Sequence, residues 1–136
     1  ETVFATTNFH AAYEPQRCLR TARYKYIRRF DDYPHPIICN VDDSPSKDVW
    51  LREGWQDRQG PVREQLYDLF FDPQETNNLA EEPTQASTTE EMRRNLHGWM
   101  EEVGDPLFDG PIQPPSGVRI NAPTDLSPHD EPKIVP

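Results

Sequence analysis

The residues of this sequence whose side-chain types are best suited to chemistry form a basic cluster, which could bind an anion. Residues 15–30 carry six cations and no acid, although the 136-residue chain has a formal net charge of −10. Such a stretch can face an anion, but pairing with the chain's 24 acidic residues is the simpler use for it. The overall acidity argues against nucleic-acid binding, which needs a positive surface to displace counterions from phosphates.

One predicted turn holds the side chains best placed to contact a ligand. These polar and aromatic residues are His10, Tyr13, Glu14 and Arg17. Turns at strand ends are where rigid scaffolds commonly present functional groups. The alternative is that His10 and Tyr13 pack at a junction while Glu14 and Arg17 pair with each other or with surface charges.

Neither the cysteines nor the paired aspartates indicate a metal centre. Cys18 and Cys39 stand neither in a CxxC pair nor near a histidine at zinc spacing. Asp42 and Asp43 offer two adjacent loop carboxylates, whereas a calcium ion takes about six or more oxygens from converging segments. We therefore predict no metal ligands in this chain.

Four strands and one helix are predicted to position these side chains. β-branched and aromatic content places strands at residues 3–9, 16–21, 23–30 and 64–71. Ser87 and Thr88 are each followed three residues on by a glutamate, a capping pattern that predicts a helix over residues 88–103. Its apolar stripe comprises Met92, Leu96, Trp99, Met100 and Val103. Gly104 can end this helix in a left-handed conformation.

The remaining segments are predicted to be irregular. Residues 31–60 hold three prolines and show no sustained period, which indicates a long ordered loop with one helical turn near Asp48. Residues 105–136 hold eight prolines, which favour an extended tail. We predict a subdomain at residues 1–104 and an extended Pro-rich tail at residues 105–136.

The predicted fold class is α+β, a small antiparallel four-stranded sheet covered by one C-terminal helix. In the third strand, alternation gives one aromatic face with Tyr24, Tyr26, Arg28 and Phe30, and one mainly basic face with Arg23, Lys25, Ile27 and Arg29. Only 34% of residues are hydrophobic and 15 are prolines, which is lean for a free-standing core. We therefore expect the chain to pack against something larger.

Three segments in order resemble the C-terminal region of the type I, formylglycine-dependent sulfatases of the alkaline phosphatase-like superfamily. They are CLRTARYKYIRRF at 18–30, QLYDLFFDPQETNNLA at 65–80 and NLHGWMEEVGDPL at 95–107. The resemblance covers about residues 3–107, and its middle segment is the most specific. The FHAAYEPQR segment at 9–17 is most similar to the heparan N-sulfatase-like bacterial members.

The resemblance implies the C-terminal subdomain of a sulfatase that hydrolyses sulfate esters or sulfamates, with sulfated glycans among the expected substrates. The implied parent, a larger α/β enzyme, uses a calcium ion and a formylglycine made from a Cys/Ser-x-Pro-x-Arg motif. Cys18 lacks the proline two residues on, so it is interpreted as a strand residue. We therefore expect the chain to be inactive alone and to act as scaffold and rim of the substrate cleft.

The partners implied are the N-terminal catalytic domain of the same sulfatase and a sulfated small molecule or glycan, with no nucleic acid and no membrane. His10, Tyr13, Glu14 and Arg17 are then the candidate substrate-binding residues. Trp50 and Trp55 could stack on a sugar, although interface packing is the simpler role. Two alternatives stay open: a phosphonate or phosphate ester hydrolase of the same superfamily, and a non-catalytic glycan- or protein-binding module. An upstream signal peptide would indicate a periplasmic, secreted or lysosome-like location, and its absence a cytoplasmic one.

Overall fold

The computed structural model describes residues 1–58, 60 and 62–135, and the chain divides into two compact units. Unit 1 consists of residues 1–7, 16–30 and 62–111, and unit 2 of residues 8–15, 31–61 and 112–136. Each unit has its own cluster of buried apolar side chains. This division does not coincide with the boundary predicted at residue 104.

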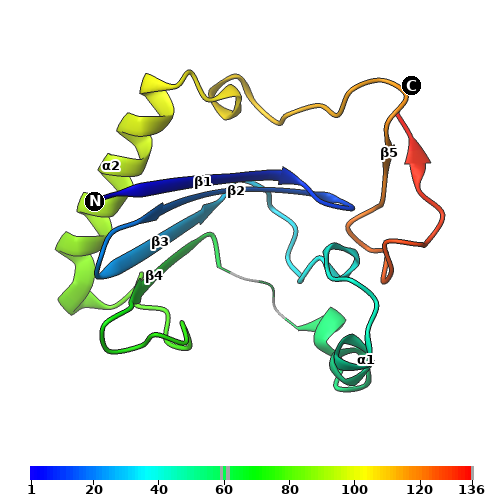
Figure 1. Ribbon diagram of the computed structural model, residues 1–136, viewed down its shortest axis with the longest axis horizontal. Helices are drawn as coiled ribbons and strands as arrows, with labels where there is room; N and C mark the ends of the chain where they lie inside the picture. The colour runs from blue at the N-terminus through cyan, green and yellow to red at the C-terminus, as the bar shows by residue number, and fades with distance from the viewer. Residues whose placement is uncertain (59, 61, 136) are drawn as a thin grey trace. The chain divides into compact units, whose positions relative to one another are not determined.

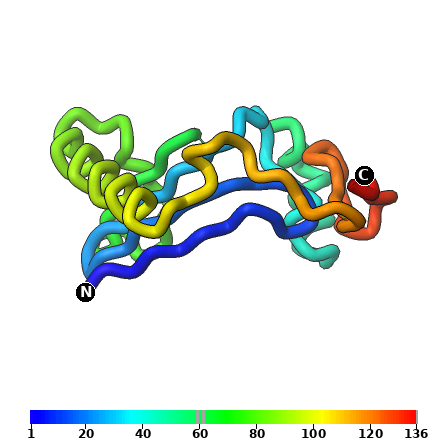
Figure 2. The backbone as a smooth tube through the Cα atoms, turned by 90° about the horizontal axis from the view of Figure 1, so that it is seen from above, coloured from blue at the N-terminus to red at the C-terminus, as the bar shows by residue number. Residues whose placement is uncertain are grey.

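A four-stranded sheet in the order β1-β2-β3-β4 is the main structure (Figure 1). Its strands are β1 (Val3–Phe9), β2 (Tyr13–Arg20), β3 (Tyr24–Arg29) and β4 (Glu64–Asp68). β3 runs antiparallel to both β2 and β4. The helix α2 (Ala86–Glu102) lies at the end of the sheet where β1 begins, in both views of the backbone (Figures 1 and 2). The predicted α+β fold of an antiparallel sheet and one covering helix is confirmed.

The core of unit 1 lies between this sheet and α2. Its buried members are Leu19, Tyr26, Leu66, Met92, Leu96 and Met100. Leu19 pairs with Tyr26 across β2 and β3, and Tyr26 pairs with Leu66 across β3 and β4, so one buried side chain from each of these three strands packs against the helix. Full burial of such side chains contributes about 1.5–3 kcal/mol each. The aromatic face predicted for the third strand is thus the core-facing one.

The start of α2 differs from the prediction. The helix begins at Ala86, directly after a 3-10 turn at Pro83–Gln85, and no side chain caps its first turn. Pro83 occupies the first position of that turn, where its fixed φ and missing N–H are tolerated. Ser87 and Thr88 therefore lie inside the helix, and the predicted capping box is wrong.

The end of α2 was predicted correctly, and the turn that follows it positions Asp105. Gly104 adopts φ +64°, and its amide donates to the Glu101 carbonyl at 3.2 Å. The Asp105 amide donates to the Met100 carbonyl at 2.9 Å, which completes a Schellman motif. The turn thereby fixes where the Asp105 side chain starts. Val103, by contrast, is exposed and does not belong to the apolar stripe.

The fourth strand is shorter than predicted. Asp68 closes a turn after it, because its carboxylate accepts from the Phe70 amide at 3.1 Å and its carbonyl from the Asp72 amide at 2.8 Å. Phe70 and Phe71 follow in this turn and are about three-quarters exposed. The strand predicted over 64–71 is therefore wrong beyond Asp68.

Unit 2 contains regular structure where a loop was predicted. The helix α1 (Pro45–Arg52) begins at Ser44, whose hydroxyl accepts from the Lys47 amide at 3.2 Å. The helical turn predicted near Asp48 lies within this helix, which is longer than one turn because Ser at the N-cap followed by Pro at N1 is a strong start signal. The helix has only eight residues and little apolar periodicity.

The tail is also more ordered than predicted. β5 (Arg119–Ile120) pairs antiparallel with β6 (Lys133–Ile134). Between them, Asn121 donates to the Asp125 carboxylate at 3.1 Å and to the Asp130 carbonyl at 3.2 Å. Side chains that bond to nearby backbone can thus order a Pro-rich segment without a long ladder. The prediction of a wholly extended tail is wrong in this part.

Candidate functional site

The predicted ligand-contacting turn is held by Asn40, which the sequence analysis did not single out. The Asn40 carboxamide oxygen accepts from the Ala11 amide at 3.0 Å and the Ala12 amide at 2.8 Å. Its nitrogen donates to the Glu14 carboxylate at 2.8 Å. His10 in this turn is exposed, whereas Tyr13 is half-buried and its hydroxyl accepts from the Ile112 amide at 3.0 Å. Asn40 thus fixes the short turn that carries His10. The prediction that Tyr13, Glu14 and Arg17 lie in this turn is wrong, because β2 begins at Tyr13 and includes all three.

Arg17 does not join the other three predicted site residues. Its side chain is 1% exposed, and its Nε and Nη2 donate to the two Asp105 oxygens at 2.5 and 2.9 Å. Its Nη1 donates to the Thr7 carbonyl at 3.1 Å. The hydrogen bonds from Arg17 hold the pKa of the Asp105 carboxyl below its usual value. Arg17 thus has a structural role within unit 1.

A pocket of about 430 Å³ lies next to Glu14 in unit 2. Its walls include Ile37, Trp55 and Arg58 together with Glu14 and Asn40. The Arg58 guanidinium lies 4.9 Å from the centre of the Trp55 ring, a cation–π distance. An apolar wall with one carboxylate, one amide and one guanidinium suits a ring that carries polar or anionic substituents.

Trp55 also stacks on Trp50, with ring centroids 5.5 Å apart and planes at 28°. Trp50 itself is 43% exposed, so one member of this aromatic pair remains open to a further partner.

The basic face predicted for the third strand is largely neutralised. Arg23 donates to the Asp68 carboxylate at 2.7 Å, and Lys25 to the Glu75 carboxylate at 2.6 Å. The hydrogen bond from Arg23 lowers the pKa of the Asp68 carboxyl. Pairing with acids, the simpler use predicted for this stretch, therefore describes these two cations.

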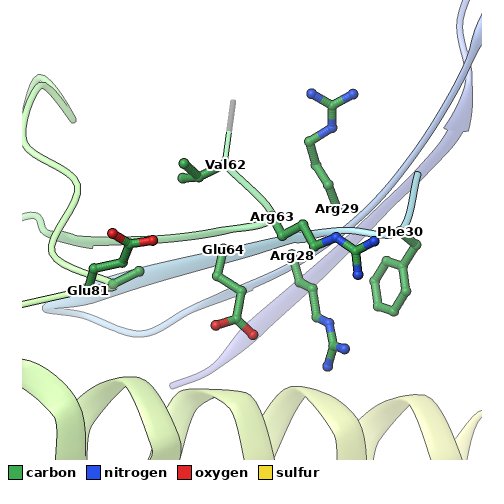
Figure 3. A pocket seen from close by; sticks show the side chains of 8 residues that line it. Arg28, Arg29, Phe30, Val62, Arg63, Glu64 and Glu81 are labelled. Atoms are coloured by element: carbon green, nitrogen blue, oxygen red, sulfur yellow. The ribbon is translucent and has the colours of Figure 1, made fainter. Parts of the chain in front are cut away.

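A second pocket, of about 330 Å³, lies in unit 1 where β3 ends and β4 begins (Figure 3). Three arginines line it, Arg28, Arg29 and Arg63. Figure 3 shows that the Arg28 and Glu64 side chains extend from the sheet toward the helix, whereas Arg29 extends away from it. Arg28 and Glu64 are register partners across β3 and β4.

Glu64 is already committed to other partners. Its carboxylate accepts from Arg93 at 2.6 and 2.9 Å and from the Tyr26 hydroxyl at 2.7 Å. The Arg93 hydrogen bonds lower the pKa of Glu64, while burial is the main cause that raises the pKa of Tyr26. Glu64 is therefore ionised at neutral pH, and its charge is balanced by Arg93 from α2.

Neither cysteine is an activated nucleophile. Cys18 lies in β2 opposite Ile27, and burial raises the pKa of its thiol. Burial also raises the pKa of Cys39 to about 11, and its sulfur donates to the Ala122 carbonyl at 3.5 Å. Both thiols are protonated at neutral pH, so neither supplies a thiolate. The interpretation of Cys18 as a strand residue is confirmed.

The part of the chain that the structure describes holds neither a candidate metal site nor a candidate membrane span. Among the described residues, no three or more His, Cys, Asp or Glu side chains group in a way that could hold a metal ion. Asp43 instead accepts from Lys47 at 2.8 Å and from the Ser127 hydroxyl at 2.5 Å. Within the same part of the chain, no helix has the length and apolar character needed to span a membrane.

Comparison with known proteins gives a consistent result. No protein-family model matches the chain. A curated ulvan-active sulfatase from Formosa agariphila is 34% identical over 109 residues, which cover 77% of this chain and 22% of that protein. A second ulvan-active sulfatase from the same organism is 31% identical over 115 residues and is covered to 19%. The chain thus spans about a fifth of the length of these relatives.

Solved structures show the same fold. A candidate sulfatase from Bacteroides thetaiotaomicron matches 95% of this chain with a TM-score of 0.56 at 19% identity, and 23% of that chain is covered. A 2-O GAG sulfatase matches 79% of this chain with a TM-score of 0.52 at 23% identity, and 18% of it is covered. The chain is thus similar in sequence to about a fifth of each of these curated ulvan-active sulfatases, and it shares the fold of part of the two solved structures.

Proposed function

We propose that the chain is the C-terminal subdomain of a formylglycine-dependent sulfatase that hydrolyses sulfate esters or sulfamates of sulfated glycans. The observation that carries the proposal is the 34% identity over 109 residues to an ulvan-active sulfatase. The resemblance of residues 9–17 favours the heparan N-sulfatase-like bacterial members as the subgroup.

In this proposal the chain supplies scaffold and cleft rim, and the N-terminal catalytic domain supplies the nucleophile and the calcium ion. The described residues contain no grouping that fits calcium, so no step of the reaction is assigned to them. The rim contribution comes from unit 2, where Glu14 and Asn40 can bond to sugar hydroxyls and Arg58 can pair with an anionic substituent. His10 in the turn and Tyr13 at the start of β2 remain predicted rim residues. Arg17 is not proposed as a rim residue, because its guanidinium is buried and pairs with Asp105.

Sequencing the gene upstream of the Glu1 codon tests the proposal. The expected result is a Cys/Ser-x-Pro-x-Arg motif in the same reading frame, in a protein that hydrolyses a chromogenic aryl sulfate. The 136-residue chain and a variant with Ala in place of the motif nucleophile serve as inactive controls. Turnover by the isolated chain above a denatured sample would contradict the proposal, and so would a preference of the intact protein for aryl phosphonate.

A further inference from the structure

Arg28 occupies a different position from the other cations of its stretch. It lines the pocket of about 330 Å³ between β3 and β4, and it also lines a third pocket, of about 280 Å³, against α2. This third pocket is bounded by the exposed face of α2, including Arg93, Arg94, His97 and Gly98. We call these two pockets, which share Arg28, the Arg28 groove. Both lie within unit 1.

Among the described residues, no carboxylate lies within ion-pair distance of the Arg28 guanidinium, although, besides the hydrogen bonds from Arg93, its charge helps to lower the pKa of the neighbouring Glu64. The guanidinium lies 5.1 Å from the centre of the Phe30 ring, a cation–π distance. Glu64, its register partner, bonds to Arg93 and Tyr26 instead. Among the described residues, neither Arg28 nor Arg94 makes an ion pair, whereas Arg23 and Lys25 of the same stretch both do.

The lining of the two pockets carries more guanidinium groups than carboxylates. Glu64 and Glu90 share one partner, Arg93, and Glu101 lies 3.6 Å from the His97 imidazole. With His97 neutral, five arginines face four glutamates, which gives the lining a formal charge of +1 on a chain of net charge −10: Arg28, Arg29, Arg63, Arg93 and Arg94 against Glu64, Glu81, Glu90 and Glu101. An anionic group entering it would restore the balance at short range, where two guanidinium forks can each bond to its oxygens.

From this geometry we propose that the Arg28 groove is a binding subsite for a sulfate group carried on a sugar chain. The inference rests on the proposed sulfatase function and adds a second contact region for a sulfated polymer, apart from the unit 2 pocket. A guanidinium suits this role because it presents planar paired donors to a tetrahedral oxyanion and stays charged at every physiological pH. The Phe30 ring holds the Arg28 guanidinium in place, which lowers the entropy lost on binding.

Binding of a defined sulfated tetrasaccharide to the 136-residue chain tests the proposal, measured by calorimetry at low and physiological salt. Arg28→Gln is expected to weaken binding about tenfold, the effect of one charge-assisted contact. Arg23→Gln, the matched control from the same stretch, leaves binding unchanged because Arg23 is paired with Asp68. Circular dichroism verifies that both variants keep the wild-type fold.

Gly98→Glu is a second variant that weakens binding without loss of structure. A Cβ at Gly98 meets no atom within 4 Å, and replacing a helix-interior glycine raises helix propensity. The added carboxylate lies four residues from Arg94 and competes with the sulfate for it. Reduced affinity together with an unchanged or raised melting temperature is the expected result.

Several outcomes would overturn the subsite. These are the absence of saturable binding by the wild-type chain up to millimolar tetrasaccharide, equal affinity of the Arg28→Gln variant, and equal binding of the desulfated tetrasaccharide. Inorganic sulfate serves as a probe for a free oxyanion. If it bound as tightly as the tetrasaccharide, the groove would be a site for free oxyanions and not for a sulfated glycan. Equal binding of a single-stranded oligonucleotide of the same charge would likewise exclude a site specific for a sulfated glycan. None of these outcomes alters aryl sulfate turnover by the intact protein, so the two proposals fail separately.

Discussion

The buried pair of Arg17 and Asp105 gives the sharpest test of the structure. The two side chains are 1% and 3% exposed and are joined by two hydrogen bonds at 2.5 and 2.9 Å. The proposed perturbation is Asp105→Asn, which keeps the oxygen that accepts from the Leu107 amide at 3.0 Å. It removes the negative charge and replaces the oxygen that accepts from Arg17 Nε with an NH2 donor. A buried guanidinium would then remain without a counter-charge.

The expected cost follows from burial. Removing one partner of a buried ion pair destabilises a protein by about 3–5 kcal/mol, whereas an exposed pair contributes about 0–1 kcal/mol. A small domain has about 5–15 kcal/mol in total, so Asp105→Asn should remove a large share of the stability. Arg17→Met combined with Asp105→Asn should cost clearly less than the sum of the two single changes.

Urea unfolding of the chain, followed by tryptophan fluorescence, measures these free energies. Trp99 stacks on Phe4 at 4.6 Å within the same unit and reports on its packing. Arg23→Gln is the control, because the Arg23 side chain is 52% exposed and its loss should cost no more than about 1 kcal/mol. If Asp105→Asn costs as little as this control, or if the two changes at the buried pair are additive, the argument from burial is refuted.

Three further predictions concern the core, the turn and acid stability. Leu66→Ala should lower the free energy of unfolding by about 2–5 kcal/mol, and Phe70→Ser by no more than about 0.5 kcal/mol, because Leu66 is fully buried and Phe70 is 75% exposed; similar urea midpoints for the two variants would contradict the observed end of β4. Asn40→Ala should cost about 1–3 kcal/mol, because two amides and Glu14 lose their partner; a thermal melt equal to that of the wild type would show that the turn does not depend on Asn40. The pKa values of Asp105 and Glu64 are lower in the folded chain than in the unfolded chain. The stability that these two carboxylates contribute is therefore fully present above about pH 5 and is lost as the pH falls through about 4 toward the folded pKa values. An unfolding free energy that increased as the pH was lowered from about 5 to about 3 would contradict this prediction.

The sheet could be predicted from the sequence because its signals are local. Alternation of aromatic side chains with cations in β3 gave the core-facing side, where Tyr26 is fully buried. Gly104 identified the end of α2, since a left-handed residue is the usual way to satisfy the last carbonyls of a helix. Errors arose where two local signals compete, as at Ser87, where a capping box lies just after a proline-initiated turn.

The candidate sites were harder to predict because they depend on long-range partners. Whether a cation is free or paired is decided by residues far along the chain, such as Asp105 for Arg17, 88 residues away. The strand pattern therefore drew attention to Arg23 and Lys25, which are paired, and assigned Arg28 to the aromatic face. Asn40 carried no signal at all, because an isolated loop asparagine reveals nothing about the amides that it binds.

The residues that carry the family resemblance stabilise the fold. They therefore bear on the family of the chain and not on its substrate. Asp72 caps its turn by accepting from the Thr76 and Asn77 amides, each at 2.8 Å. Asn78 accepts from the Leu66 amide at 2.9 Å and donates to the Glu64 carbonyl at 3.1 Å, so it closes the open edge of β4. Side chains bonded in this way can identify a fold but do not determine which substrate binds. Substitutions in this motif should therefore reduce stability. On the proposed function, changes in glycan preference should come from side chains that the resemblance does not include, Trp55 and Arg58 in unit 2.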